Sequence, residues 1–249
     1  FGSDSGVLTY SCQDFDNGGV VYTSSLNQSD CLRNDDGELL FQNGGGAACT
    51  NCFEQAGGVE DIDGAYALKL FHDNGDPGYT EKGRDLNRFR CELNAYKKLL
   101  TSGVCARGFV PKLYGYINRM DPAAFRPAFQ HFAQDKLKPR AILLEYLPNS
   151  ESLNCVNYSD ALYPQAIEGM KEIHKAGVHH HDTYPRNLLL VRENPDRLVW
   201  IDFDVATTFT NFGCEQLSRC DYEVALVKGF GEALRDDQAE GLPPNTKFY

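Results

Sequence analysis

Apolar residues along this chain follow two different spacings, and these spacings predict where strands and helices lie. Between 86 and 100, apolar residues recur at intervals of three or four, as on the buried face of a helix. Short runs rich in apolar residues are instead typical of strands. Such runs occupy 65–71, 111–118, 141–148, 188–191 and 198–201. Separate helices and short strands predict an α+β fold.

Two further helices are expected in the second half of the chain. One runs from about Asp160 to Lys175, with Asp160 placed to cap it, Pro164 in its first turn and Gly177 after its end. The other covers Cys220–Leu234 and is expected to be buried. The first of these helices leads directly into a segment with an unusual set of polar residues.

That segment reads Val-His-His-His-Asp-Thr-Tyr-Pro-Arg-Asn from 178 to 187. Asp182 and Asn187 come just before the strand expected at 188–191, and Asp202 comes just after the strand expected at 198–201. A turn between these strands would make a hairpin, which brings Asn187 and Asp202 to the same end. Two carboxylates and an amide in this order suit metal-assisted phosphoryl transfer.

The segment resembles the catalytic loop and the metal-binding loop of the protein kinase superfamily, whose patterns are H-x-D-x-x-x-x-N and D-F-G. The resemblance implies that Asp182 orients the attacking hydroxyl and accepts its proton. Asn187 and Asp202 would hold Mg²⁺ against the phosphates of ATP, and Arg186 would bring a cation to the transferring group. His180 would bond the backbone near the metal-binding loop.

Residues upstream extend the resemblance. The run Ala65–Phe71 is similar to the strand pattern V-A-I-K, so Lys69 would neutralise the α- and β-phosphates. Glu92, on the helix expected at 86–100, would be the ion-pair partner of Lys69. The run 141–148 looks like a kinase hinge, in which Glu145 and Leu147 would bind adenine through their backbone groups.

A glycine-rich turn is the weakest part of the match. Gly44 and Gly46 would let backbone N–H groups approach the phosphates, but a plain flexible loop explains these glycines equally well.

Departures from the family pattern narrow the prediction. His181 replaces the arginine that reads a phosphorylated activation loop, so control by loop phosphorylation is not expected. Asp204 replaces the glycine of D-F-G and is either a second metal contact or a turn cap, with the cap favoured. No A-P-E sequence follows Asp202, so the usual peptide platform is missing. Asp221 would bond the backbone of the catalytic loop.

The expected architecture is therefore a two-lobed protein-kinase-like fold. Residues 1–37 would form a polar extension or edge strands, 38–147 a small β-rich lobe with one helix that ends in the hinge, and 148–249 a shortened helical lobe. The resemblance implies an ATP- and Mg²⁺-dependent kinase that phosphorylates a protein hydroxyl. The alternatives are a small-molecule kinase of the aminoglycoside or choline type and a pseudokinase that acts as a binding module.

Composition constrains partners and compartment. The formal net charge of −11 argues against nucleic acid or an anionic membrane as partner. No apolar run reaches the length of a membrane span. Nine scattered cysteines fit a reducing compartment better than a disulfide framework, so a cytoplasmic protein is expected.

Two alternative metal or redox sites are disfavoured. Consecutive histidines point to opposite faces of a strand, so the cluster His179–His181 is a poor zinc site, and His179 and His181 are expected to pack or lie at the surface. Cys49 and Cys52 form a lone C-x-x-C, which predicts neither zinc nor redox use.

Overall fold

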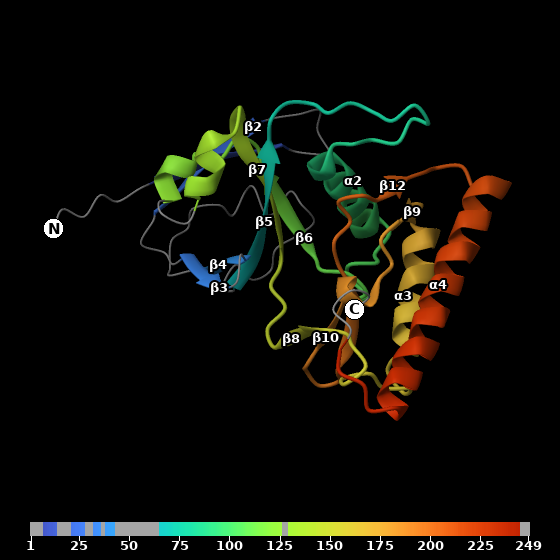
Figure 1. Ribbon diagram of the computed structural model, residues 1–249. Helices are drawn as coiled ribbons and strands as arrows, with labels where there is room; N and C mark the ends of the chain where they lie inside the picture. Colours follow the sequence, from blue (N-terminus) through green and yellow to red (C-terminus); the bar gives the residue numbers. More distant parts are fainter. Residues whose placement is uncertain are drawn as a thin grey trace. The chain divides into compact units, whose positions relative to one another are not determined.

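The protein folds into two compact units of mixed α and β structure, so the predicted α+β class is confirmed (Figure 1). Unit 1 comprises Phe1–Pro77 and Leu113–Tyr146, and unit 2 comprises Gly78–Lys112 and Leu147–Tyr249. The computed structural model describes residues 7–13, 21–27, 32–35, 38–42, 65–125 and 129–244. The segment 78–112, which the sequence predicts as part of 38–147, packs in unit 2.

Unit 1 is built on a five-stranded antiparallel sheet with β5 at its centre. The strand order is β3-β4-β5-β7-β6. The strands are β3 Leu32–Asp35, β4 Glu38–Gln42, β5 Ala65–Asp73, β6 Leu113–Ile117 and β7 Leu137–Glu145. The strands predicted at 65–71, 111–118 and 141–148 are confirmed, although β7 begins and ends earlier than its apolar run.

Smaller elements complete unit 1. The strands β1 Val7–Gln13 and β2 Val21–Asn27 form an antiparallel hairpin within the segment predicted as an extension or edge strands. Two 3₁₀ helices, η1 Pro122–Phe125 and η2 Gln130–Gln134, lie between β6 and β7 in the sequence. Ala141–Leu144 on β7 are all buried, as in a strand covered on both faces.

In its described residues, unit 2 combines three α-helices and one short 3₁₀ helix, η3 Pro185–Asn187, with two small sheets. The helices are α2 Arg88–Thr101, α3 Pro164–Lys175 and α4 Cys214–Ala239. A three-stranded sheet has the order β11-β10-β8, and a separate two-stranded sheet pairs β12 with β9. The strands are β8 Ser150–Ser152, β9 Val178–His179, β10 Leu188–Val191, β11 Arg197–Trp200 and β12 Thr207–Thr208.

The helix predicted at 86–100 is confirmed as α2. Asn87 caps it by accepting a hydrogen bond from the backbone N–H of Arg90 at 3.0 Å, which supplies one of the partners that a helix N-terminus lacks. Phe89, Leu93 and Tyr96 then recur on its buried face. Leu86 precedes the cap and is exposed, so the apolar stripe begins earlier than the helix.

The helix predicted from Asp160 is confirmed as α3, but its predicted cap is wrong. The N-cap position belongs to Tyr163, and Pro164 opens the first turn. Asp160 lies outside the helix, where its carboxylate accepts hydrogen bonds from the Tyr158 hydroxyl at 2.9 Å and from Arg235 at 2.7 Å. Arg235 of α4 therefore binds the carboxylate that was predicted to cap α3.

Helices α3 and α4 lie side by side in unit 2 (Figure 1). The Tyr163 hydroxyl donates to the backbone oxygen of Val227 at 2.6 Å, and the Tyr163 ring lies against Gly231, where there is no room for a Cβ atom. The indole N–H of Trp200 donates to the backbone oxygen of Ala166 at 3.0 Å, which ties the end of β11 to α3. These contacts fix the frame that carries the loops beyond β9 and β11.

Across the described residues, no helix is both long and apolar enough to cross a bilayer.

Candidate functional site

Two loops of unit 2 carry the predicted catalytic and metal-binding residues. The first loop, 180–187, joins β9 to β10, and the second, 201–206, joins β11 to β12. Strand pairing holds the two loops where they meet the strands. Leu188 lies opposite Trp200 in one sheet, and Thr207 lies opposite His179 in the other. The predicted hairpin is confirmed, and it places the two loops beside each other.

Backbone bonds lock the two loops together at Ile201. Its N–H donates to the carbonyl oxygen of Asn187 at 3.0 Å, and its carbonyl oxygen accepts from Nε2 of His180 at 2.9 Å. Asp202 is the next residue, so the first loop holds the backbone on which the Asp202 carboxylate is mounted. The predicted bond from His180 to the backbone of this loop is confirmed.

His180 acts here as a neutral imidazole. Its side chain is fully buried, and burial lowers the pKa of the ring, so the uncharged form is the stable one. Nε2 donates to Ile201, while Nδ1 accepts from the backbone N–H of Asp182 at 3.3 Å. One ring thus positions the backbone of both Asp182 and Asp202.

Glu223 of α4 anchors the start of the first loop. Its carboxylate accepts from the backbone N–H groups of His180 at 3.1 Å and His181 at 2.8 Å, and from Nε2 of His174 at 2.7 Å. Burial alone would raise the pKa of Glu223, but these hydrogen bonds outweigh it and lower the pKa to about 2. The group is therefore an ionised, fully bonded anchor.

The predicted anchor Asp221 is wrong, because its side chain is exposed on α4. The sequence does contain a signal for Glu223. It lies three residues after the buried Cys220 and four before the buried Val227, which is the spacing of a buried helical stripe. A carboxylate inside such a stripe needs buried donors, and the loop backbone supplies them.

Asp182 lies at the partly exposed surface of the first loop. The Arg186 guanidinium donates to both Asp182 carboxylate oxygens at 3.1 Å, and it lies 4.9 Å from the centre of the Tyr184 ring. The side-chain amide of Asn187 donates to the backbone oxygen of Asp182 at 2.8 Å. The predicted Asp182, Arg186 and Asn187 therefore contact one another within the first loop.

Backbone strain is concentrated at this site. Among the described non-glycine residues, positive φ angles occur at Arg119, Asn149, His181 and Asp202. Two of these lie at the predicted site. His181, with φ of 66°, directly precedes Asp182, and Asp202, with φ of 64°, is itself a predicted metal ligand. Such conformations are unfavourable for residues with a Cβ and persist where surrounding bonds over-determine them, often at functional sites.

The donors at the site fit Mg²⁺ in company with phosphates. Because Nδ2 of Asn187 is bonded to Asp182, Oδ1 is the amide atom left to ligate a cation, and Asp202 adds a carboxylate. Mg²⁺ commonly takes one or two protein oxygen groups and fills its other positions with phosphates and water. No group of three or more His, Cys, Asp or Glu side chains in the described ranges is arranged as a metal cage.

Asp204 lies in a turn that is closed by a hydrogen bond from Ala206 N–H to the Phe203 carbonyl oxygen at 3.0 Å. Its carboxylate pairs with Arg88 at the start of α2. Phe203, which directly precedes Asp204, is buried against Tyr96 of α2 and against His180. Helix α2 therefore supports the second loop through Arg88 and Tyr96.

The three histidines of the cluster bond to different partners. His179 lies over the Phe209 ring and contacts the backbone oxygen of Gln216 at 3.1 Å. Nε2 of His181 lies 2.7 Å from Oγ1 of Thr207, and burial lowers the pKa of His181 to about 4. Their predicted packing roles are confirmed, since each ring is held in its own contact.

The remaining predicted site residues are divided between the two units. Lys69 lies on β5 opposite Ile142, and Glu145 is the last residue of β7, both in unit 1. Glu92 is fully buried on α2 in unit 2, so its predicted ion pair with Lys69 joins residues of different units and stays a prediction. Leu147 is buried in unit 2.

Four predicted residues lie outside the described part of the chain. These are Gly44, Gly46, Cys49 and Cys52.

Neither protein-family models nor the curated proteins searched give a match. Function is therefore inferred from the bonded arrangement of the two loops and from the residues they carry.

Proposed function

We propose that this protein is a kinase-like phosphotransferase that transfers the γ-phosphate of ATP, with Mg²⁺, to a hydroxyl group of a protein. The observation that supports this most directly is the mutual locking of the two loops at Ile201, which places Asp182, Asn187 and Asp202 on one rigid backbone frame. Phosphoryl transfer depends mainly on positioning and charge stabilisation, and such a frame supplies positioning.

Each residue has a distinct role in this proposal. Asp182 orients the acceptor hydroxyl and takes its proton, and Arg186, bonded to Asp182, supplies positive charge near the transferring group. Asn187 and Asp202 hold Mg²⁺, which when bound neutralises charge on the ATP phosphates. His180 and Glu223 do not touch substrate; they fix the backbone of both loops.

The proposal includes a two-lobed kinase-like fold, with unit 1 as the smaller lobe and unit 2 as the larger. The chain crosses from unit 1 to unit 2 between Tyr146 and Leu147, directly after β7, which supports a hinge at this point. Adenine would bind there through the backbone groups of Glu145 and Leu147. Lys69 would reach the α- and β-phosphates from the central strand of unit 1.

A second candidate is a small-molecule kinase of the aminoglycoside or choline type. It is favoured by the short connection after the second loop, because β12 ends at Thr208 and α4 already begins at Cys214. Protein kinases use a longer segment here to hold a peptide. A metabolite acceptor would need no such platform.

Transfer of labelled γ-phosphate from Mg-ATP into a cell extract tests the proposal, with protein and small molecules separated afterwards. We expect label in the protein pool with the wild type and a loss of at least about a hundredfold with Asp182→Asn, which removes the general base. Asp196→Asn, at a partly exposed position in the β10–β11 turn away from the two loops, is the matched control and should behave as wild type.

Label confined to small molecules would favour the second candidate. Label in neither pool, with ATP binding intact, would contradict transfer and favour a pseudokinase.

A further inference from the structure

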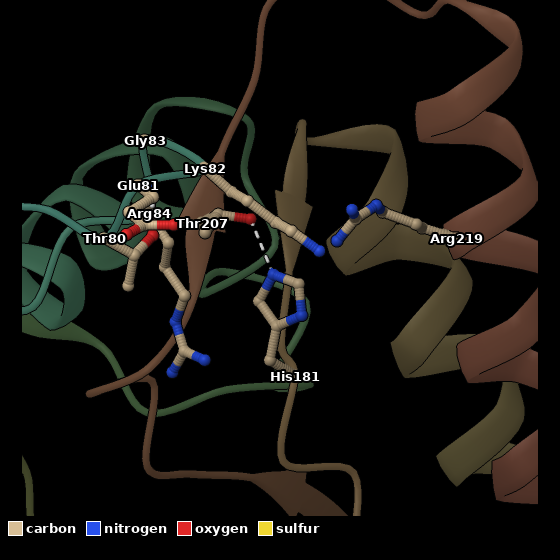
Figure 2. A pocket seen from close by; sticks show the side chains of 8 residues that line it. All are labelled: Thr80, Glu81, Lys82, Gly83, Arg84, His181, Thr207 and Arg219. Atoms are coloured by element: carbon tan, nitrogen blue, oxygen red, sulfur yellow. Dashed lines mark hydrogen bonds between the residues drawn. The ribbon is translucent and has the colours of Figure 1, made fainter.

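A pocket of about 620 Å³ lies in unit 2 beside the first loop (Figure 2). Four separate parts of the sequence line it: the segment that precedes α2, the first loop at His181, the strand β12 at Thr207, and α4 at Arg219. Its lining residues are Thr80, Glu81, Lys82, Gly83, Arg84, His181, Thr207 and Arg219. The volume is in the range of sites for small molecules.

The pocket is positively charged in a protein that is strongly acidic. Lys82, Arg84 and Arg219 line it, against a single acidic lining residue, Glu81, while the whole chain carries −11. Within the described ranges, neither Lys82 nor Arg84 has an ion-pair partner, and Arg219 pairs with Glu215 at 3.1 Å. Gathering cations in one place is unfavourable unless an anion joins them.

The cations occupy different sides of the pocket. Figure 2 shows the Lys82 ammonium and the Arg219 guanidinium pointing into the same space near the His181 ring, whereas the Arg84 guanidinium is directed away from them. One small anion could contact the first two cations, and a second anionic group is needed to engage Arg84. The arrangement therefore suits a ligand with more than one charged group.

Neutral polar groups add hydrogen-bonding capacity. Thr80 and Thr207 place hydroxyls at the lining, and Gly83 exposes backbone without a side chain. Burial lowers the pKa of His181 to about 4, so near neutral pH its ring contributes hydrogen bonding rather than charge. Guanidinium and ammonium groups combined with hydroxyls are the usual partners of phosphate oxygens.

We propose that this pocket binds a small polyanion that carries at least two phosphate groups. Lys82 and Arg219 hold one group, and Arg84 holds another. The inference does not depend on the proposed kinase activity, because none of the pocket cations is assigned to the ATP site.

Calorimetric titration with inorganic pyrophosphate, at about 0.15 M ionic strength, tests the pocket directly. We expect wild-type protein to bind pyrophosphate at least about tenfold more tightly than inorganic phosphate. Lys82→Ala and Arg219→Ala should each weaken pyrophosphate binding about tenfold, as expected for one charge-assisted contact. Lys228→Ala, an exposed lysine on α4 that does not line the pocket, is the matched control and should bind as wild type.

Two more variants distinguish this pocket from the proposed nucleotide site. Lys69→Met and Asp202→Asn should leave pyrophosphate binding unchanged. If these two variants lose binding and Lys82→Ala keeps it, the pyrophosphate occupies the nucleotide site, and the pocket proposal is overturned while the proposed function is supported. An absence of binding by wild type overturns it as well.

Lys82 is exposed, and so is much of the Arg219 side chain, so Lys82→Ala and Arg219→Ala should unfold at the same temperature as wild type.

Discussion

At the scale of single residues, the ionised Glu223 is the most constrained group of the site. Glu223 is almost fully buried and accepts three hydrogen bonds, two of them from the loop that carries Asp182. The sequence pattern points to the motif histidines and Asp182, yet the residue that anchors their backbone, Glu223, lies on α4, about forty residues later. Sequence patterns locate chemistry more readily than the partners that position it.

Glu223→Gln should therefore destabilise the protein by about 3 kcal/mol, because an amide presents a donor where the loop needs an acceptor. Phosphate transfer should fall with it, since Asp182 is no longer positioned. Chemical denaturation and transfer assays measure the two effects. Asp221→Asn, two residues away and exposed, should change neither; equal effects of both changes would contradict the anchoring role.

The pH dependence of stability follows in part from His181. Burial lowers its pKa to about 4 in the folded protein, whereas an unfolded histidine titrates near 6.5. The unfolded chain thus binds more protons between these values, so the free energy of unfolding falls as the pH drops from about 6.5 to 4. Glu223 adds a further loss below about 4.5, because its folded pKa is about 2.

Denaturation at pH 7 and pH 5 should show a loss of stability to which His181 contributes about 2 kcal/mol, and His181→Asn should reduce the loss by that amount. His131→Gln, an exposed histidine in unit 1, should leave the loss in place. A pH dependence that His181→Asn does not alter would show that other groups are responsible.

At the scale of elements, the strands and helices could be predicted where apolar spacing alone decides. The hairpin of β10 and β11 and the helix α2 are examples, because burial of their apolar residues outweighs other preferences. The cap at Asp160 was not predictable in this way, since Arg235, distant in sequence, competes for the same carboxylate. The cationic pocket could not be predicted either, because its lining comes from four separate parts of the sequence.

Gly177 marks a point where element packing requires a glycine. Its φ is 76°, and a Cβ there would collide with the carbonyl oxygen of Phe209, whose N–H donates to the Gly177 carbonyl oxygen at 2.8 Å. Gly177→Ala should lower the free energy of unfolding by at least about 2 kcal/mol. Gly229→Ala, on open helix surface of α4, should be neutral or slightly stabilising in the same denaturation experiment. A neutral Gly177→Ala would contradict this packing.

At the scale of the whole molecule, the predicted site residues belong to two units. Asp182, Arg186, Asn187 and Asp202 lie in unit 2, whereas Lys69 and Glu145 lie in unit 1. The order of these motifs along the chain predicts that they act together, but order alone does not determine distances between separately packed units. Binding of one ligand by residues of both units is what the proposed function requires.

ATP affinity in the presence of Mg²⁺ or of a chelator is the measurement that tests this requirement most directly. The wild type should bind ATP with Mg²⁺ at least about tenfold more tightly than without it, and both Asp202→Asn and Lys69→Met should lose most of this affinity. Asp182→Asn should bind as wild type, because Asp182 acts on the acceptor. ATP binding that is unchanged by Mg²⁺, by Asp202→Asn and by Lys69→Met would contradict the proposed phosphotransferase activity. An absence of ATP binding would contradict it as well.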